Sequence, residues 1–248
     1  MLSYEGIVKI SLIVLAIFIV GILLVKRFLY FRPSSDFLPY KDTYQDMSEG
    51  KLHGWFLQGS GEKAILYCHG NAGNISHRQS YIDSLNSLGY SVLIFDYSGY
   101  GRSRGIPSES QFYHDASVFM SMLMKNYDVK NIILYGESLG AAVAAHIALK
   151  YQVPKLILDS GLPSVKRYMK DKFGVLGVLS FLFPEFDTEK YLKNYNGSIL
   201  VMHSHMDNII SYYTTDVVRA CATRVIDLQG GHNDRIIPWK HVDMFIKD

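Results

Sequence analysis

The chain has 248 residues, of which 48% are hydrophobic, and a formal net charge of +2. This length is enough for one α/β domain with a full core and too short for two domains of ordinary size. The small net charge argues against a nucleic-acid-binding protein. The two cysteines, Cys68 and Cys221, exclude a disulfide framework and form no metal-binding pattern. Cys68 stands in an apolar run, and we interpret it as a core residue.

The N-terminal segment is far more apolar than the rest of the chain. Residues 6–25 read GIVKISLIVLAIFIVGILLV, with Lys9 as the only charge. About 20 helical residues, each rising about 1.5 Å, span the roughly 30 Å of a bilayer core. The pattern predicts a single-pass membrane anchor within residues 1–32. A cleaved signal peptide and a buried core helix are the alternatives, and the following sequence KRFLYFRP lacks a small-x-small cleavage site.

The charges beside this segment favour one membrane orientation. Lys26, Arg27 and Arg32 follow the apolar run, whereas Lys9 and the amino terminus precede or begin it. The positive-inside bias therefore favours a cytosolic catalytic domain by a thin margin. Two formal glycosylation triplets, at Asn74 and Asn196, are weak evidence for the opposite orientation.

Residues 33–50 read as an irregular linker, and residues 51–248 read as one domain in which strands and helices alternate. The predicted strands are apolar, β-prone runs: Ala64–Cys68, Ser91–Phe95, Asn131–Tyr135, Lys155–Leu158, Ser198–Met202 and Arg224–Leu228. The predicted helices between them are His77–Leu88, Glu109–Asn126, Leu139–Tyr151, Tyr212–Cys221 and Pro238–Ile246. Continuous apolar strands separated by helices predict a mostly parallel central sheet with helices on both faces.

A glycine-flanked serine stands between one predicted strand and the next helix. Gly136-Glu137-Ser138-Leu139-Gly140 has the pattern Gly-x-Ser-x-Gly, with a strand before it and an alanine-rich helix after it. A sharp turn in this context exposes the serine hydroxyl above the sheet, and the glycines avoid clashes that a Cβ would cause. The pattern predicts that Ser138 is a catalytic nucleophile, although the motif alone also fits an ordinary turn.

A serine nucleophile needs a base, and the base needs an acid that fixes its tautomer. In this architecture the acid and then the histidine follow the serine along the chain. Asp207 comes after the strand Ser198–Met202, and His232 comes after the strand Arg224–Leu228. Because the carboxyl ends of parallel strands share one crevice, we expect Ser138, Asp207 and His232 to converge.

Other residues compete for these roles. Asp159 also follows a predicted strand and is the alternative acid. His241 falls in a helical pattern, whereas His203 and His205 belong to the acid loop. Asp234 lies close to His232, where we expect it to cap or orient the histidine loop.

A tetrahedral intermediate also needs backbone N–H donors that are already in place. One comes from the residue after the nucleophile, which is Leu139. The other should come from the glycine-rich loop His69-Gly70-Asn71-Ala72-Gly73 after an earlier strand, and Asn71 is the predicted donor. The alternative, purely structural interpretation of His69-Gly70 is a turn that ends the strand and contains a structural histidine.

Four blocks together resemble a known family: YCHGNAGNISHR, FDYSGYGRSRGIPSE, NIILYGESLG and GGHND. They are similar to α/β-hydrolase-domain proteins of the bud-emergence type, which carry one N-terminal membrane segment. The last three are also similar to the branch that removes fatty acyl groups from protein cysteines. The resemblance covers about residues 67–234 and implies an α/β-hydrolase fold, with Ser138, Asp207 and His232 as triad. It also implies Asn71 and Leu139 as backbone donors.

The resemblance leaves two local questions. Ser204 stands where relatives usually have glycine, which affects the expected shape of the acid loop. Residues of about 162–195 are predicted to form a small lid insertion, and the run KFGVLGVLSFLFPEF, residues 172–186, fits an acyl pocket, a membrane contact or core packing.

The functional hypothesis is therefore a membrane-anchored serine hydrolase that cleaves acyl ester or thioester bonds, without a metal or cofactor. Its substrates would be lipids or S-acylated proteins, and we expect no nucleic-acid partner. The alternative is a catalytically silent binding or scaffold protein with the same fold at a membrane. The sequence does not identify the acyl chain or the leaving group.

Overall fold

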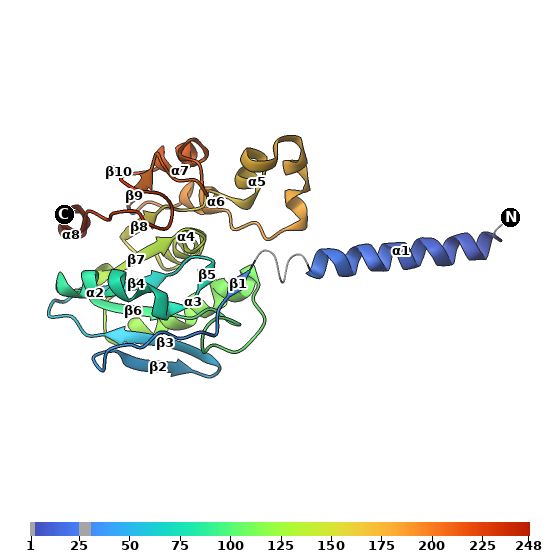
Figure 1. Ribbon diagram of the computed structural model, residues 1–248. Coiled ribbons are helices and arrows are strands. Elements are labelled where there is room, and N and C mark those ends of the chain that lie inside the picture. The colour runs from blue at the N-terminus through green and yellow to red at the C-terminus, as the bar shows by residue number, and fades with distance from the viewer. Residues whose placement is uncertain (1–2, 25–30) are drawn as a thin grey trace.

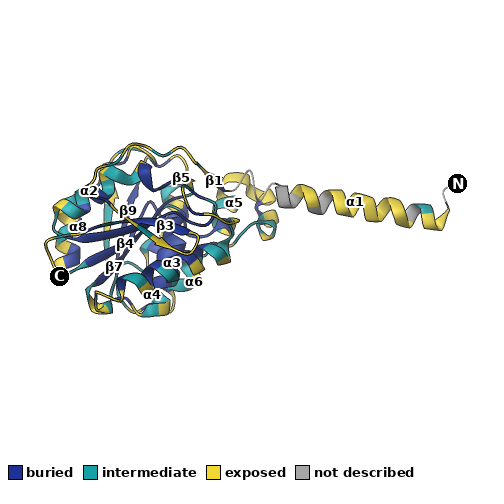
Figure 2. Ribbon diagram, turned by 90° about the horizontal axis from the view of Figure 1, so that it is seen from below, coloured by how far each residue is buried: buried dark blue, intermediate teal, exposed yellow. Residues whose placement is uncertain are grey.

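The computed structural model describes residues 3–24 and 31–248. Helix α1, Tyr4–Leu24, extends away from the domain that the rest of the chain forms (Figure 1). Most of its length is coloured as exposed in Figure 2. Across residues 3–24 and 31–248, no helix combines the length and apolarity needed to cross a membrane, so the predicted transmembrane anchor is not supported. Val25, Lys26 and Arg27, on which that prediction also relied, lie outside the described residues.

One sheet of eight strands forms the centre of the domain, in the order β10-β9-β8-β7-β4-β6-β3-β2. Neighbouring strands from β10 to β6 are parallel, and β3 is antiparallel to both β6 and β2. The strands are β2 Gln45–Glu49, β3 Leu52–Leu57, β4 Ala64–Cys68, β6 Ser91–Phe95, β7 Ile132–Glu137, β8 Lys155–Asp159, β9 Ser198–Ser204 and β10 Arg224–Leu228. A separate parallel pair joins β1 Arg32–Pro33 to β5 Ala72–Gly73. All six predicted strands are present within one to two residues.

Helices cover both faces of this sheet, as the alternating pattern predicts. The α-helices are α2 Gln79–Ser87, α3 Glu109–Leu123, α4 Gly140–Tyr151, α5 Val165–Phe173, α6 Thr188–Leu192, α7 Asp216–Arg219 and α8 Trp239–Lys247. The 3₁₀ helices are η2 Ile75–Arg78, η3 Val129–Asn131, η4 Gly174–Leu182 and η5 Tyr212–Thr215. The predicted helices at 77–88 and 212–221 each begin as a 3₁₀ turn and continue as an α-helix.

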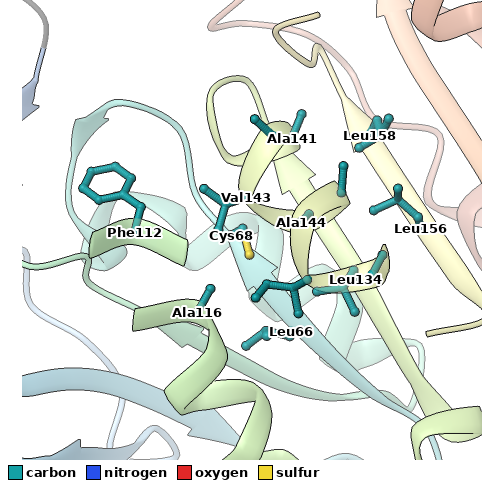
Figure 3. Packing of buried hydrophobic residues seen from close by; sticks show 14 of the residues in the cluster. Leu66, Cys68, Phe112, Ala116, Leu134, Ala141, Val143, Ala144, Leu156 and Leu158 are labelled. Atoms are coloured by element: carbon teal, nitrogen blue, oxygen red, sulfur yellow. The ribbon is translucent and has the colours of Figure 1, made fainter. Parts of the chain in front are cut away.

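The core is divided by the sheet because successive side chains of a strand point to opposite faces. Leu66 and Leu134 belong to one cluster, which α3 and α4 cover, and Figure 3 shows both beside Ala144 of α4. Tyr67 and Tyr135, one residue further along the same strands, belong to the other cluster, with residues of α2 and α8. Figure 3 also shows Cys68 inside the first cluster, where burial raises the pKa of its thiol, as expected for a core cysteine.

The predicted irregular linker, residues 33–50, is wrong in its last part. Residues 45–49 form β2, which pairs along its length with β3. The sequence QDMSE has no apolar alternation because four of its five side chains face solvent at the sheet edge. Phe31 also belongs to the folded domain, since its ring lies 5.3 Å from Phe112 and 6.2 Å from Phe186.

The segment predicted to form a lid is mainly helical. It contains α5, η4 and α6, between β8 and β9. Helix α5 and the chain that follows it project from the top of the domain in Figure 1, on the same side as α1. The lid therefore lies beyond the carboxyl end of β8, at the edge of the sheet where the predicted site residues gather.

Candidate active site

Ser138 occupies a strained turn between β7, which ends at Glu137, and α4, which begins at Gly140. Its φ is +52°, in the left-handed region that non-glycine residues rarely adopt. A Cβ on Gly140 would lie 2.1 Å from the carbonyl oxygen of Cys68, and one on Gly136 would lie 2.6 Å from Cα of Ala141. Both flanking glycines are thus required by close backbone packing, as the motif predicts.

The structure brings the three predicted triad residues together. The His232 Nε2 atom lies 3.1 Å from the Ser138 hydroxyl, and its Nδ1 atom lies 2.7 Å from the Asp207 carboxylate. Asp207 follows β9 and His232 follows β10, and these strands are parallel neighbours. The convergence at one edge of the sheet follows from that topology.

The Asp207 carboxylate is held on both of its oxygens. Oδ1 accepts hydrogen bonds from the backbone N–H groups of Ile209, at 2.9 Å, and Ile210, at 2.8 Å. Oδ2 faces His232 and also lies 3.3 Å from Nε2 of the buried His203. Burial alone would raise the pKa of Asp207, but the hydrogen bonds and nearby histidines lower it below its usual value. The carboxylate is therefore ionised and oriented at neutral pH.

The competing residues have other partners. Asp159 receives a bidentate ion pair from Arg235, at 2.6 and 2.8 Å, and a hydrogen bond from the Tyr135 hydroxyl at 2.9 Å. Asp234 accepts a hydrogen bond from the N–H of Gly231 at 2.8 Å, so it braces the histidine loop as expected. Asp207, not Asp159, contacts His232.

Ser204, the position at which the chain departs from the family pattern, joins the acid loop to the histidine loop. Its hydroxyl donates a hydrogen bond to the carbonyl of Gly230 and accepts one from the N–H of Met206, the latter at 3.0 Å. A glycine could make neither bond. The departure thus adds a link between the two loops that carry Asp207 and His232.

Sequence reasoning missed a buried ionic network beneath the triad. Arg235 donates to the carbonyl of His232 and lies 3.6 Å from Glu137, in addition to its pair with Asp159. Arg78 forms a second bidentate pair with Glu137, at 3.0 and 3.2 Å. Although burial opposes it, these two arginines lower the pKa of Glu137. The ionic partners lie 59 to 98 residues apart, and the only sequence signal was an arginine three residues after His232.

A cavity of about 480 Å³ adjoins the Ser138 hydroxyl. Its apolar wall includes Leu139, Leu162, Val165, Ile209 and Ile210. Its polar wall includes Arg32, Asn71, Arg78, Tyr168, Lys172, Asn208, His232 and Asn233. The two predicted backbone donors, Asn71 and Leu139, both line this cavity, and the Asn71 side chain accepts a hydrogen bond from Tyr100 at 2.8 Å.

His69, beside the predicted donor loop, is a buried structural residue. Its Nδ1 atom lies 2.7 Å from the carbonyl oxygen of Gly70, and its Nε2 atom has no hydrogen-bond partner among the described residues. Burial, together with the nearby Arg78, lowers the pKa of His69 to about 4. The ring is neutral at pH 7, as the structural interpretation of this turn expects.

Comparison with known proteins gives relatives that align with most of this chain. An uncharacterized protein of Acanthamoeba polyphaga mimivirus is 33% identical over 73% of this chain and 70% of its own length. Alpha/beta hydrolase domain-containing protein 17C of Mus musculus is 30% identical over 71% of this chain and 56% of its own length. Both alignments cover more than two thirds of this chain.

Solved structures share the fold at low sequence identity. The Pyrococcus furiosus esterase Pf2001 superposes with a TM-score of 0.70 at 19% identity, over 87% of this chain and 98% of its own. A thioesterase domain from the curacin biosynthetic pathway superposes with a TM-score of 0.58 at 15% identity, over 83% and 98%. The Hydrolase_4 family model, described as serine aminopeptidase, S33, matches residues 59–198, which is more than half of the chain. The chain therefore belongs to this family of α/β hydrolases.

Proposed function

We propose that this protein is a serine hydrolase that cleaves acyl ester or thioester bonds through an acyl-enzyme intermediate. The observation that carries the proposal is the hydrogen-bond chain from Asp207 through His232 to Ser138, at 2.7 and 3.1 Å, beside a cavity. His232 accepts the hydroxyl proton while Ser138 Oγ attacks the acyl carbonyl carbon. Asp207 fixes the Nδ1–H tautomer and stabilises the imidazolium that forms.

The following steps need only the same residues and water. The tetrahedral intermediate collapses, His232 returns the proton to the departing alcohol or thiol, and the acyl group stays on Ser138. A water molecule then loses a proton to His232 and attacks the ester carbon, and Ser138 leaves with that proton. The backbone N–H groups of Asn71 and Leu139 are proposed to hold the oxyanion, a contribution of roughly 3 kcal/mol for each donor.

The cavity supports an acyl substrate. Leu162 and Val165 come from the lid side, whereas Ile209 and Ile210 come from the acid loop, so apolar side chains face the nucleophile from two elements. An acyl chain would bury its apolar surface against them. An esterase and a thioesterase domain share the fold, which supports both leaving-group classes without choosing between them.

Localisation at a membrane is part of the proposal. It rests on the apolar sequence of residues 6–25, and exposed apolar side chains of α1, such as Leu12 and Ile17, support it. In more detail, we propose that the segment spans the membrane once and that the catalytic domain lies in the cytosol, because basic residues follow the apolar run.

A catalytically silent scaffold is the competing proposal, and a fluorophosphonate probe separates the two. Such probes label only a serine that an adjacent base activates. We expect the wild-type protein to be labelled and Ser138→Ala to remain unlabelled, with Ser160→Ala as a control that changes another serine near the site. An unlabelled wild-type protein with an intact fold would favour the scaffold.

A further inference from the structure

The 3₁₀ helix η4 and the residue before it carry a cluster of exposed apolar side chains, which we call the lid patch. Its members are Phe173, Val175, Leu176, Val178, Leu179 and Phe181. Val175 is 91% exposed and Phe181 is 74% exposed. Monomeric soluble proteins rarely expose so many neighbouring apolar side chains, and such patches mark protein or membrane contacts. The sequence left three interpretations open for residues 172–186. The exposure of these six side chains excludes core packing for them.

The lid patch is held in place by its packing on α5. Gly177 is buried, and a Cβ there would lie 2.6 Å from Cα of Lys170. The chain reverses at Gly174, whose φ is +56°. The close backbone contact fixes η4 against α5, so α5 and η4 form a hairpin whose apolar side chains are exposed in a defined arrangement.

The charges next to the lid patch are mainly positive. Helix α5 reads VKRYMKDKF, with four basic residues and one acidic residue, Asp171. Arg167 pairs with Glu189 at 2.9 Å, whereas Lys166 and Lys170 are exposed to solvent. An apolar patch flanked by lysines is the pattern of a surface that inserts shallowly into a bilayer with anionic headgroups.

The apolar N-terminal helix is tethered beside the same hairpin. Phe31, where the described domain begins, contacts Phe186, which lies between η4 and α6, and Arg32 lines the cavity together with Lys172 of α5. Leu24, the end of α1, is seven positions before Phe31, a reach of at most about 25 Å. Figures 1 and 2 both show α1 leaving the domain on the side of α5. The two exposed apolar segments can thus meet one apolar phase.

We propose that the lid patch docks on an anionic lipid surface, with its apolar side chains in the acyl boundary and Lys166 and Lys170 at the headgroup phosphates. The charge pattern and the nearby apolar helix favour a bilayer over a protein partner as the occupant. This contact is independent of the chemistry at Ser138. If the proposed hydrolase function also holds, Val165, Tyr168 and Lys172 of α5 place one cavity wall at the bilayer surface, where an acyl chain can enter.

The test uses the full chain carrying Ser138→Ala, so that no catalysis is needed, and Cys221→Ser, so that only an introduced cysteine reacts. Val178→Cys carries an environment-sensitive fluorophore, and Met244→Cys on α8, which is also exposed, is the matched control. The proteins are reconstituted with phosphatidylcholine vesicles, with or without phosphatidylserine, that contain doxyl-labelled lipid as quencher. We expect a blue shift and quenching at position 178 but not at 244, larger with phosphatidylserine.

One double variant and three outcomes decide the proposal. Lys166→Glu with Lys170→Glu should abolish the increase that phosphatidylserine causes. Equal signals at positions 178 and 244 would show that the lid patch does not face the bilayer. A blue shift without doxyl quenching would assign the lid patch to a protein contact, and insensitivity to phosphatidylserine would remove the anionic surface. Failure of the serine probe experiment would leave each of these readouts unchanged.

Discussion

Ser138, Asp207 and His232 meet at one edge of the sheet, which we call the triad edge. It adjoins the lid hairpin of α5 and η4, yet the two regions satisfy opposite physical demands. At the triad edge, buried carboxylates are paired: Asp159 with Arg235, and Glu137 with Arg78. In the hairpin, apolar side chains are exposed and only Gly177 of η4 is buried. A buried charge without a partner is costly, so the first region tolerates little change. In the second region, apolar side chains remain in contact with water, which is unfavourable. This indicates that another apolar phase covers them.

This difference separates the predictions for the triad edge from those for the exposed apolar segments, which are the lid hairpin and the N-terminal helix. Changes at the triad edge should alter rate or stability strongly in any assay. Changes in the N-terminal helix should leave soluble chemistry intact and affect only membrane-borne substrates.

The largest effect is expected from Asp207→Asn. The backbone N–H groups of Ile209 and Ile210 hold Oδ1, so the NH2 group of the amide would face Nδ1 of His232 and donate to it. The base would then take the wrong tautomer and lose its compensating charge. We expect kcat to fall by roughly 10⁴-fold, measured with a short water-soluble ester. Asp234→Asn in the histidine loop is the matched control, because its Oδ1 can still accept from Gly231. Comparable losses in both variants would remove Asp207 as the acid.

Gly140→Ala should have the next largest effect. The added Cβ would stand 2.1 Å from a backbone oxygen of β4, so α4 must move away from the sheet. We expect unfolding free energy to fall by at least about 4 kcal/mol, seen as a lower urea midpoint or as insoluble protein. Gly61→Ala, whose nearest atom would be 3.2 Å away, is the control and should cost far less. Equal stability of the two variants would contradict the close packing at the Ser138 turn.

The sequence predicted the parallel strands and the convergence of Ser138, Asp207 and His232 because both depend on local patterns. Six strands read as apolar runs, and Ser138 has glycines at fixed spacing. The edge strand β2 was missed because its side chains are exposed, and the pair of Asp159 with Arg235 was missed because the two residues lie 76 positions apart. An apolar run also cannot reveal whether it is buried, which is why the exposure of the lid patch emerged only from the structure.

Arg235→Met tests the network that sequence reasoning missed. Without the guanidinium, Asp159 is left buried with the Tyr135 hydroxyl but without an ionic partner, and the His232 carbonyl loses a donor. We expect unfolding free energy to fall by about 3 kcal/mol or more, and kcat to fall with little change in KM because His232 is less well positioned. Arg224→Met, which breaks an exposed pair with Asp248, is the control. Arg224→Met should lower the unfolding free energy by about 0.5 kcal/mol or less. Equal effects of the two variants would show that the buried network stabilises the fold no more than an exposed ion pair.

His69 predicts a pH dependence of stability. Its pKa is lowered from 6.5 to about 4 in the folded protein. The unfolded chain therefore binds a proton that the folded protein does not bind between these values. Stability from this group is fully present above pH 6.5 and is lost as pH falls toward 4, on the order of 3 kcal/mol.

His69→Asn should reduce that loss, because an amide can keep the bond to the Gly70 carbonyl without titrating. Urea unfolding at pH 7 and pH 5 gives the comparison. His203 and His146, whose pKa values burial also lowers, remain in the variant, so the slope should decrease without vanishing. An unchanged slope would show that His69 does not resist protonation.

The smallest effect on soluble chemistry is expected from removal of residues 1–24. The cut must stop before Phe31, because its ring packs on Phe112 and Phe186 and Arg32 lines the cavity. The truncated protein should hydrolyse a short water-soluble ester with unchanged kcat. It should hydrolyse vesicle-borne acyl substrates more slowly, because tethering raises the effective concentration of substrate. Carbonate extraction of the full chain belongs beside these assays, since recovery of intact protein in the supernatant would remove the anchor. An equal loss of activity on both substrates would instead show that the catalytic domain needs α1. The contrast between a fixed triad edge and a membrane-directed side would then no longer hold.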